Sequence, residues 1–360
     1  MRRGGSRGPA RVGSVNLRDV AAKAGVSPAT ASRVFGGSES VHAETRARVL
    51  AAAAELGYVM NGLARSMLGR GPRTIAFVVR QMIGPTFAAL AAGVESLATE
   101  NGYLLLICTT GADAEREREV ITTLQEQRVF AVLLVGSSDS GATFETRMTQ
   151  YARELATIDA PLIFCGRPPI EGHPEIVSVE YDQKAGIAAS IDHLESLGHR
   201  DIVYVGQPRG RTTAELRMDG YIAAMASTGL AEPRIVESDN TEDDSARAVG
   251  ELLDAGTAAT ALVCMTDNIA VGAYRALRAR GMRIPGDMSV VGFDDVPIVA
   301  DLTPGLTTVR PPFREVGVDA AEIALGLRPS ANVLLAPQLI VRGSTAPPRD
   351  RPIASRRRES

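Results

Sequence analysis

The 360-residue sequence predicts a small all-α domain at its amino end, followed by a larger α/β region divided into two lobes. Over residues 16–70, apolar side chains recur at helical spacing between short turn signals. From residue 74 onward, runs of Val, Ile and Leu alternate with amphipathic helical segments. This alternation is typical of parallel sheets that are covered on both faces. It runs through two successive rounds, so we expect two lobes.

The first predicted helix spans residues 17–24, LRDVAAKA, with its apolar side chains on one face. Asn16 is expected to cap its first turn, and Gly25 to end it, since glycine adopts the left-handed conformation without strain. Ser27 and Pro28 have the character of an N-cap and a first position for a second helix, PATASRVF. Two helices joined by a short turn predict a helix-turn-helix, whose second helix usually lies in the DNA major groove.

Residues 41–57 form a third predicted helix, with an apolar face and Gly57 as its stop. Residues 61–68, NGLARSML, form a short predicted helix before the linker 69–73. A helix this short is marginal in isolation, so we expect it to form only against a partner.

The first round of strands and helices covers residues 74–179, beginning with the strand TIAFVV and continuing through YLLLICT, VFAVLLVG, PLIFC and IVSV. The second round begins at Asp182 and contains the strands DIVYVG, TALVCM and MSVVGF, with a further strand near Ile235. Ligands bind at the carboxyl ends of strands in such sheets. We therefore expect a ligand cleft between the lobes.

The distribution of charge and the positions of the cysteines limit the classes of protein to which this chain can belong. Residues 1–70 carry a net charge of +7 and the remaining residues −10, so a polyanion would bind at the amino end. No apolar run approaches the length of a membrane helix, and the basic amino terminus lacks the apolar core of a signal peptide. Cys108, Cys165 and Cys264 are far apart and are expected to be buried thiols, which predicts a cytoplasmic protein.

The sequence of residues 16–72 resembles the headpiece and hinge of the LacI/GalR (lactose-repressor) family. DVAAKAGVSPATASRVF, ETRARVLAAAAELGY and NGLARSM occur in that family's order and spacing, and the resemblance continues to about Pro347. It implies an effector domain of the periplasmic-binding-protein-like (type I) fold. In that fold the chain crosses between the lobes three times, here expected near Val179, Val309 and Leu335.

The predicted boundaries follow from this resemblance. They are a disordered basic arm (1–13), a helix-turn-helix domain (14–60), a hinge helix and linker (61–73), a ligand-binding and dimerisation domain (74–346) and a disordered basic tail (347–360). Within the large domain, the expected N-lobe is about 74–179 and 309–334, and the C-lobe about 180–308 and 335–346.

The family's variable base-reading positions fall on Pro28 and Ala29, with Thr30 beside them. Neither Pro28 nor Ala29 can donate a bidentate hydrogen bond, so we expect apolar contact with bases. Arg33 can grip guanine O6 and N7, although a phosphate contact or a solvated surface position is the alternative. The side chains expected at the DNA backbone are the hydroxyls of Ser27, Ser32 and Thr45.

By resemblance, paired hinge helices enter the minor groove and wedge a side chain between base pairs. The family places leucine at the wedge, where this sequence has Met67, and the neighbouring Leu68 competes for the role. Ala64 is small where two hinge helices would approach. The full set of hinge candidates is Asn61, Ala64, Arg65, Met67 and Leu68. His42 departs from the family at the cap of the third helix, which is usually serine.

The expected effector site uses residues at strand ends. Arg217, in RMDGY, matches a family arginine that hydrogen-bonds ligand, and Asp294, in VVGFDD, matches a ligand-binding acid. The other candidates are Thr86, Phe87, Ser137, Arg167, Asn240 and Thr266. The alternative for each is a residue that caps a helix or lines a loop. Because the chain has no tryptophan and few aromatics, polar or charged ligands remain open beside sugars.

Nothing in the sequence predicts catalysis, a metal or a cofactor. Lys23 and Lys184 are the only lysines, and neither belongs to a phosphate-binding loop. The four histidines show no metal-ligand spacing with the cysteines, and His193 and His199 are expected to make local hydrogen bonds.

The sequence thus predicts a ligand-responsive transcriptional regulator, and favours a repressor over an activator. A homodimer would bind a pseudo-palindromic operator, because two headpieces match two half-sites. A small polar effector, such as a sugar, would act from the cleft. The alternatives are a binding sensor without specific DNA readout and an enzyme on the same lobes.

Overall fold

A computed structural model describes residues 15–58, except 37 and 39, and residues 74–349, except 83 and 140. The chain forms two compact units, residues 1–72 and residues 73–360. The basic arm, the linker and most of the tail lie outside the described residues. So do the hinge candidates Asn61, Ala64, Arg65, Met67 and Leu68.

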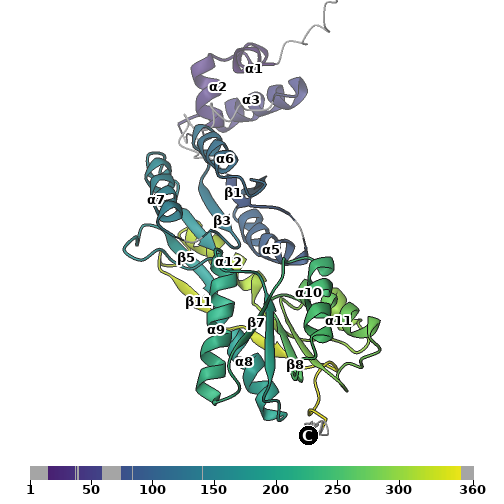
Figure 1. Ribbon diagram of the computed structural model, residues 1–360. Coiled ribbons are helices and arrows are strands. Elements are labelled where there is room, and N and C mark those ends of the chain that lie inside the picture. The colour runs from purple at the N-terminus through teal and green to yellow at the C-terminus, as the bar shows by residue number, and fades with distance from the viewer. Residues whose placement is uncertain are drawn as a thin grey trace, which may run out of the picture. The chain divides into compact units, whose positions relative to one another are not determined.

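The first unit contains three helices, α1 (Leu17–Ala24), α2 (Pro28–Phe35) and α3 (Ala43–Leu56), labelled in Figure 1. Asn16 caps α1: its Oδ1 accepts the Arg18 N–H at 2.9 Å, and the Asp19 carboxylate accepts the Asn16 N–H at 2.8 Å. Gly25 then ends α1 at φ 68°, in the left-handed region. The local signals in the sequence therefore determine the turn between α1 and α2.

The predicted N-cap of α2 and the predicted glycine stop of α3 are both present. The Ser27 hydroxyl accepts the Thr30 N–H at 3.1 Å at the start of α2, and Gly57 ends α3 at φ 61°. His42 precedes α3 without a side-chain cap. The core between the helices consists of small and β-branched side chains, among them Val20, Ala31 and Val49.

The second unit contains two lobes, each built on a six-stranded sheet. The N-lobe sheet has the order β11-β5-β4-β3-β1-β2, and all its strand pairs are parallel. Its strands are β1 (Thr74–Val79), β2 (Leu104–Thr109), β3 (Ala131–Val135), β4 (Leu162–Cys165), β5 (Val177–Tyr181) and β11 (Val333–Leu335). Its helices are α5 (Pro85–Glu100), α6 (Ala114–Glu126), α7 (Ala142–Ala156) and α12 (Phe313–Ala324).

The C-lobe sheet has the order β12-β10-β9-β8-β6-β7 and is parallel except for the pair of β10 with β12. Its strands are β6 (Ile202–Gly206), β7 (Arg234–Glu237), β8 (Ala261–Cys264), β9 (Ser289–Phe293), β10 (Thr307–Arg310) and β12 (Gln338–Ile340). Its helices are α8 (Gln183–Ser196), α9 (Thr212–Thr228), α10 (Glu242–Asp254) and α11 (Asp267–Ala279), with the 3-10 turn η1 (Pro297–Ala300).

The chain passes between the lobes at three places: from β5 to α8, from β10 to α12, and from β11 to β12. β10 keeps Val309 and Arg310 in the C-lobe sheet, and β11 keeps Leu335 in the N-lobe sheet. α12 and β11 therefore belong to the N-lobe although they follow most of the C-lobe in sequence.

α5 and α12 lie unusually close together on one face of the N-lobe sheet. A Cβ at Gly317 would lie 2.2 Å from the Leu90 carbonyl oxygen, and one at Gly93 would lie 2.2 Å from the Arg314 carbonyl oxygen. The two backbones touch at these glycines, because any side chain there would clash with a neighbouring backbone rather than with a movable side chain.

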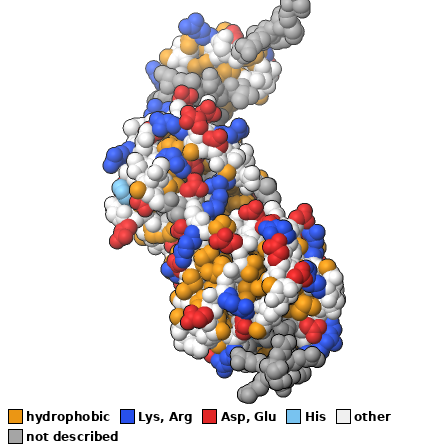
Figure 2. Space-filling view, in the orientation of Figure 1, with side chains coloured by type: hydrophobic (Ala, Val, Ile, Leu, Met, Phe, Trp, Pro, Cys, Tyr) orange, Lys and Arg blue, Asp and Glu red, His pale blue; other side chains and the backbone are white. Residues whose placement is uncertain are grey.

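The strands at one edge of each sheet are less buried than the sequence predicts. Leu104, Leu106 and Ile107 on β2 have exposed fractions of 72%, 42% and 44%. On β7, the corresponding edge of the C-lobe sheet, Ile235 is 37% exposed. Figure 2 shows hydrophobic side chains gathered on the C-lobe around this edge. The prediction of strands covered on both faces is thus wrong for β2.

Candidate ligand cleft and nucleic-acid interface

The second helix of the headpiece presents the predicted DNA-contacting residues on its surface. Pro28, Ala29 and Arg33 are exposed, and Ala29 and Arg33 share a face because they are four residues apart. Thr30 is half-buried, with its Oγ1 2.9 Å from Ser27 Oγ, so this pair also stabilises the first turn of α2. Ser32 and Thr45 are half-buried.

The headpiece also carries cations that form no ion pair with a carboxylate among the described residues. Lys23 is paired with Glu55 at 2.5 Å. Arg18, Arg33 and Arg48 are exposed, and none forms an ion pair with another described residue. Such side chains can release counterions from a phosphate backbone, which is the main source of affinity for nucleic acid.

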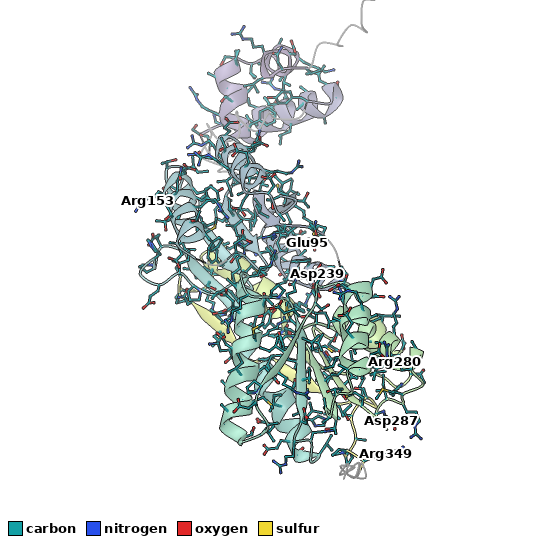
Figure 3. All side chains as sticks on the ribbon, in the orientation of Figure 1. Glu95, Arg153, Asp239, Arg280, Asp287 and Arg349 are labelled. Atoms are coloured by element: carbon teal, nitrogen blue, oxygen red, sulfur yellow. The ribbon has the colours of Figure 1, made fainter. Side chains whose placement is uncertain are left out.

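A cleft of about 620 Å³ lies between the two lobes, at the carboxyl ends of their strands. All the predicted effector residues except Arg167 line it: Thr86, Phe87, Ser137, Arg217, Asn240, Thr266 and Asp294. Asp239, which also lines the cleft, lies near the junction of the two lobes in Figure 3. The cleft is large enough for a small metabolite.

Arg217 is 2% exposed and is held from four directions. Its Nε donates to Gln183 Oε1 at 3.0 Å, and its Nη1 donates to the Met265 carbonyl at 2.5 Å. Its Nη2 donates to the Tyr181 hydroxyl and to Asp294 Oδ1, each at 3.1 Å. Four of its five donors are thus used inside the protein, and one of these bonds holds Asp294.

Asp294 lies at the end of β9 with φ 110°, an uncommon conformation for any residue other than glycine. Burial raises the pKa of this carboxyl, and the Arg217 guanidinium counteracts the rise. The loop that follows is tied down from α11, where Asp267 Oδ2 accepts the Val296 N–H at 2.8 Å. The side chain of Asp294 is 17% exposed and can accept hydrogen bonds from a ligand.

The residues at three other strand ends have structural partners as well as faces in the cleft. Thr266 caps α11 and donates to Asn240 Oδ1 at 2.5 Å. Ser137, which follows β3 in the N-lobe, accepts the Thr213 N–H of α9 in the C-lobe at 3.3 Å. Ser137 therefore caps a helix of the opposite lobe, whose own N-cap residue, Arg211, makes no side-chain capping hydrogen bond.

Phe87 supplies an aromatic wall on the N-lobe side. Its ring lies so close to Gly136 that a Cβ there would be 2.9 Å from the ring, and Gly136 has φ 77°. Tyr181 and Phe313 line the cleft as well, with ring centroids 5.5 Å apart in an edge-to-face arrangement. The cleft thus has more aromatic surface than composition predicts.

Sequence reasoning missed two arginines of the cleft, Arg80 and Arg211. Arg80 directly follows β1, and its Nη1 contacts Asp139 Oδ1 at 3.0 Å. Arg211 precedes α9, and burial and the nearby Arg80 lower its pKa. A charged residue next to a buried strand at the carboxyl edge was the available signal for Arg80. Arg211 gave no such signal.

The prediction that Arg167 lies in the effector cleft is wrong. Arg167 lines an adjoining cavity of the N-lobe instead. Side chains alternate between the faces along an extended chain. Gly166 lies at the cleft, so the next side chain points away from it. The position of Arg167 after β4 in the sequence could not reveal the direction of its side chain.

His193 and His199 make hydrogen bonds through their rings, but with partners that are distant in the sequence rather than local. His193 Nε2 lies 2.9 Å from Thr345 Oγ1, and His199 contacts Thr260, Ser289 and Ala346. Among the described residues, no group of three or more His, Cys, Asp or Glu could hold a metal ion. No helix in the described part of the chain is long and apolar enough to span a membrane.

Comparison with known proteins identifies both units. Residues 16–61 match the family model for bacterial regulatory proteins of the lacI family, and residues 191–345 match the model for a periplasmic binding protein-like domain. The ribose operon repressor of Haemophilus influenzae is 34% identical over 312 residues, which are 86% of this chain and 90% of that protein. The transcriptional repressor PurR of Vibrio cholerae is 31% identical over 86% of this chain and 90% of its own length.

The solved structures agree with these relatives. The lac repressor dimer bound to operator and the anti-inducer ONPF has a TM-score of 0.80 and 27% identity, and the match covers 92% of this chain and 99% of that chain. A complex of the transcriptional regulator CelR with cellobiose has a TM-score of 0.66 and 28% identity, over 92% and 99% of the two chains.

Proposed function

This chain belongs to the lacI family of bacterial regulatory proteins, and we propose that it is a repressor whose hold on operator DNA is controlled by a small molecule in the interlobe cleft. The observation that carries the proposal is the presence of both parts on one chain: a helix-turn-helix headpiece with exposed Arg33, and a polar cleft of about 620 Å³. Because a bacterial repressor binds chromosomal DNA, this protein would act in the cytoplasm.

On the DNA side, α2 is the proposed recognition helix. Pro28, Ala29, Thr30 and Arg33 would face bases, and Ser27, Ser32 and Thr45 would contact phosphates. The exposed cations of the headpiece support this orientation, since phosphate contacts position a protein on DNA before bases are read. The hinge candidates would follow into the minor groove.

On the ligand side, Asp294, Asn240 and Thr266 would accept or donate hydrogen bonds from the C-lobe, and Thr86 and Phe87 would close over the ligand from the N-lobe. Ser137 already joins the lobes through the α9 N-terminus. A ligand that stabilises this contact between the lobes would shift the hinge helices, and by linkage DNA binding would change the ligand affinity by the same factor. We propose no catalytic role, in keeping with relatives that are transcriptional regulators.

The proposed assembly is a homodimer. The edge strand β2 exposes Leu104, Leu106 and Ile107, and an exposed apolar edge strand invites pairing. A second copy of the chain is the partner that two-fold symmetric DNA requires.

The test is fluorescence anisotropy of the full chain on a palindromic duplex with a central CG step, against a scrambled duplex, across a salt series. A preference of about 10³ or more for an operator supports the proposal. Equal, salt-sensitive binding to all duplexes, including those recovered by genomic footprinting, would instead indicate a sensor without specific readout.

Arg33→Ala sharpens the same experiment. If Arg33 reads guanine, the variant loses about 1–3 kcal/mol at one base position and discriminates less there. The matched control is Arg48→Ala on α3, which removes another exposed cation of the headpiece. A uniform loss on every sequence from Arg33→Ala would make Arg33 a phosphate contact.

A further inference from the structure

A second cavity lies in the N-lobe beside the cleft and has a volume of about 60 Å³. The two share Arg80, Ala112 and Ser137, so they adjoin. A single water requires roughly 15 Å³ of such volume, so the cavity has room for more than one water or for a small ion.

Arg167 forms part of the wall and is only 2% exposed. Its Nη2 donates to the Val135 carbonyl at 3.1 Å, and its guanidinium carbon lies 5.7 Å from the centre of the Phe164 ring. Its Nε and Nη1 have no hydrogen-bond partner among the described residues. Ser138 Oγ, in the same wall, is also buried without a partner. A buried cation with two donor nitrogens that lack acceptors destabilises the protein unless a bound molecule accepts from them.

The neighbouring charges do not provide that partner. Glu117 accepts from Arg147 Nε at 3.0 Å, and Asp139 accepts from Arg80 Nη1 at 3.0 Å. Asp113 accepts the N–H groups of Glu115 and Arg116 at the start of α6. Each acid of the cavity is therefore already engaged, and Arg167 forms no ion pair with any described residue.

Arg167 nevertheless remains a cation at neutral pH. Burial lowers its pKa to about 10, and Glu117 opposes this decrease. A buried, charged fork with two unused donor nitrogens and a nearby hydroxyl is a geometry suited to an oxyanion.

We propose that this cavity binds a small oxyanion, and that this oxyanion is a phosphate group. Arg167 would donate from Nε and Nη1, and Ser138 from its hydroxyl. The anion comes either from free phosphate or from a phosphorylated effector whose remainder occupies the cleft, which Phe87, Arg80 and Arg211 line. The second source rests on the proposed function of the cleft.

The experiment is isothermal titration of the full chain with inorganic phosphate in a buffer free of other oxyanions. We expect binding to the wild type, and binding at least about tenfold weaker to Arg167→Met, because a charge-assisted hydrogen bond is lost. Ser138→Ala removes only a hydroxyl without a partner, so it keeps the fold and still weakens phosphate binding. The matched control is Arg153→Met, which changes an exposed arginine of α7 that points away from the lobe in Figure 3.

Parallel titrations with ribose 5-phosphate and ribose distinguish the two sources. A phosphorylated effector is indicated if ribose 5-phosphate binds more tightly than both ribose and phosphate, and if phosphate competes with it. Free phosphate is indicated if ribose 5-phosphate binds no more tightly than inorganic phosphate. In both cases the Arg167→Met variant is the weaker binder.

Two results would overturn the proposal. One is no binding of phosphate or ribose 5-phosphate to the wild type, which would mean that water fills the cavity. The other is equal binding to the wild type, Arg167→Met and Ser138→Ala, which would indicate an adventitious ion only. Operator binding is measured on the same samples, so a failure of the proposed function is seen separately from a failure of this site.

Discussion

Buried polar side chains hold together parts of the C-lobe that are distant in the chain. His199 Nδ1 lies 2.8 Å from Thr260 Oγ1, and its Nε2 lies 2.9 Å from the Ala346 carbonyl and 3.1 Å from Ser289 Oγ. The imidazole is 1% exposed. It thereby connects the end of α8, two neighbouring strands and the last described segment.

This contact predicts a pH dependence of stability. Burial lowers the pKa of His199, with the Ala346 carbonyl opposing the shift. Below about pH 6.5 the unfolded chain takes up a proton that folded His199 resists, so the stabilisation present at neutral pH is lost as the pH falls. Urea unfolding from pH 5 to 8 should show wild type and His199→Gln converging at low pH, with a slope of up to about 1.4 kcal/mol per pH unit.

His173→Gln provides the control, because His173 is half-exposed and bonds to Glu175 at the surface. A wild type that stays equally far above His199→Gln at every pH would show that the imidazole does not titrate in this way.

Individual residues also mark where sequence reasoning reaches its limit. The caps of α1 and α2 could be predicted because Asn16, Gly25 and Ser27 act within four residues of their partners. The sequence placed Arg217 near the cleft but could not predict its hydrogen bonds. Its partners Gln183, Tyr181 and Met265 come from elements that are distant in the chain. The orientation of Arg167 depended on which side of the sheet it faced.

Among the elements, the packing of α5 on α12 is the least tolerant contact of the N-lobe. Gly317→Ala would place a methyl group 2.2 Å from the Leu90 carbonyl oxygen. The helices would have to separate, so we expect a loss of about 1–3 kcal/mol in the free energy of unfolding despite the better helix propensity of alanine. Chemical denaturation followed by circular dichroism measures this loss.

Gly250→Ala on α10 is the matched control. The nearest atoms there belong to the end of the Arg280 side chain, at 2.9 Å and beyond, and this side chain can move. Gly250→Ala should therefore be close to neutral. Equal stability of the two variants would mean that α5 and α12 can separate without loss.

The strand elements show what a pattern of apolar residues can and cannot predict. LLLICT on β2 and LIFC on β4 are both apolar runs, yet β4 is buried throughout and β2 is largely exposed. The difference lies in their places in the sheet: β4 has neighbours on both sides, and β2 is an edge. Strand order depends on tertiary contacts, which a local pattern does not contain.

At the scale of the whole molecule, the exposed edge gives a prediction about assembly. Leu104 is 72% exposed in the single chain, so Leu104→Lys should leave the fold intact. If β2 forms the dimer interface, the variant becomes a monomer in analytical ultracentrifugation and loses at least about tenfold in operator affinity, because each headpiece then binds a half-site alone.

Leu327→Lys serves as the control, because Leu327 is 57% exposed and lies after α12 rather than on β2. A Leu104→Lys protein that dimerises as tightly as this control would place the interface elsewhere on the surface.

The order of the elements along the chain has a consequence for synthesis. The N-lobe begins at β1, but its core includes α12 and its sheet ends with β11, residues 313–335. The described core of the headpiece, in contrast, uses residues only up to 58. During translation the DNA-binding unit can therefore fold early, while the N-lobe stays unfinished until nearly the whole chain has left the ribosome. A messenger RNA truncated late in the gene would yield a headpiece without the domain that controls it.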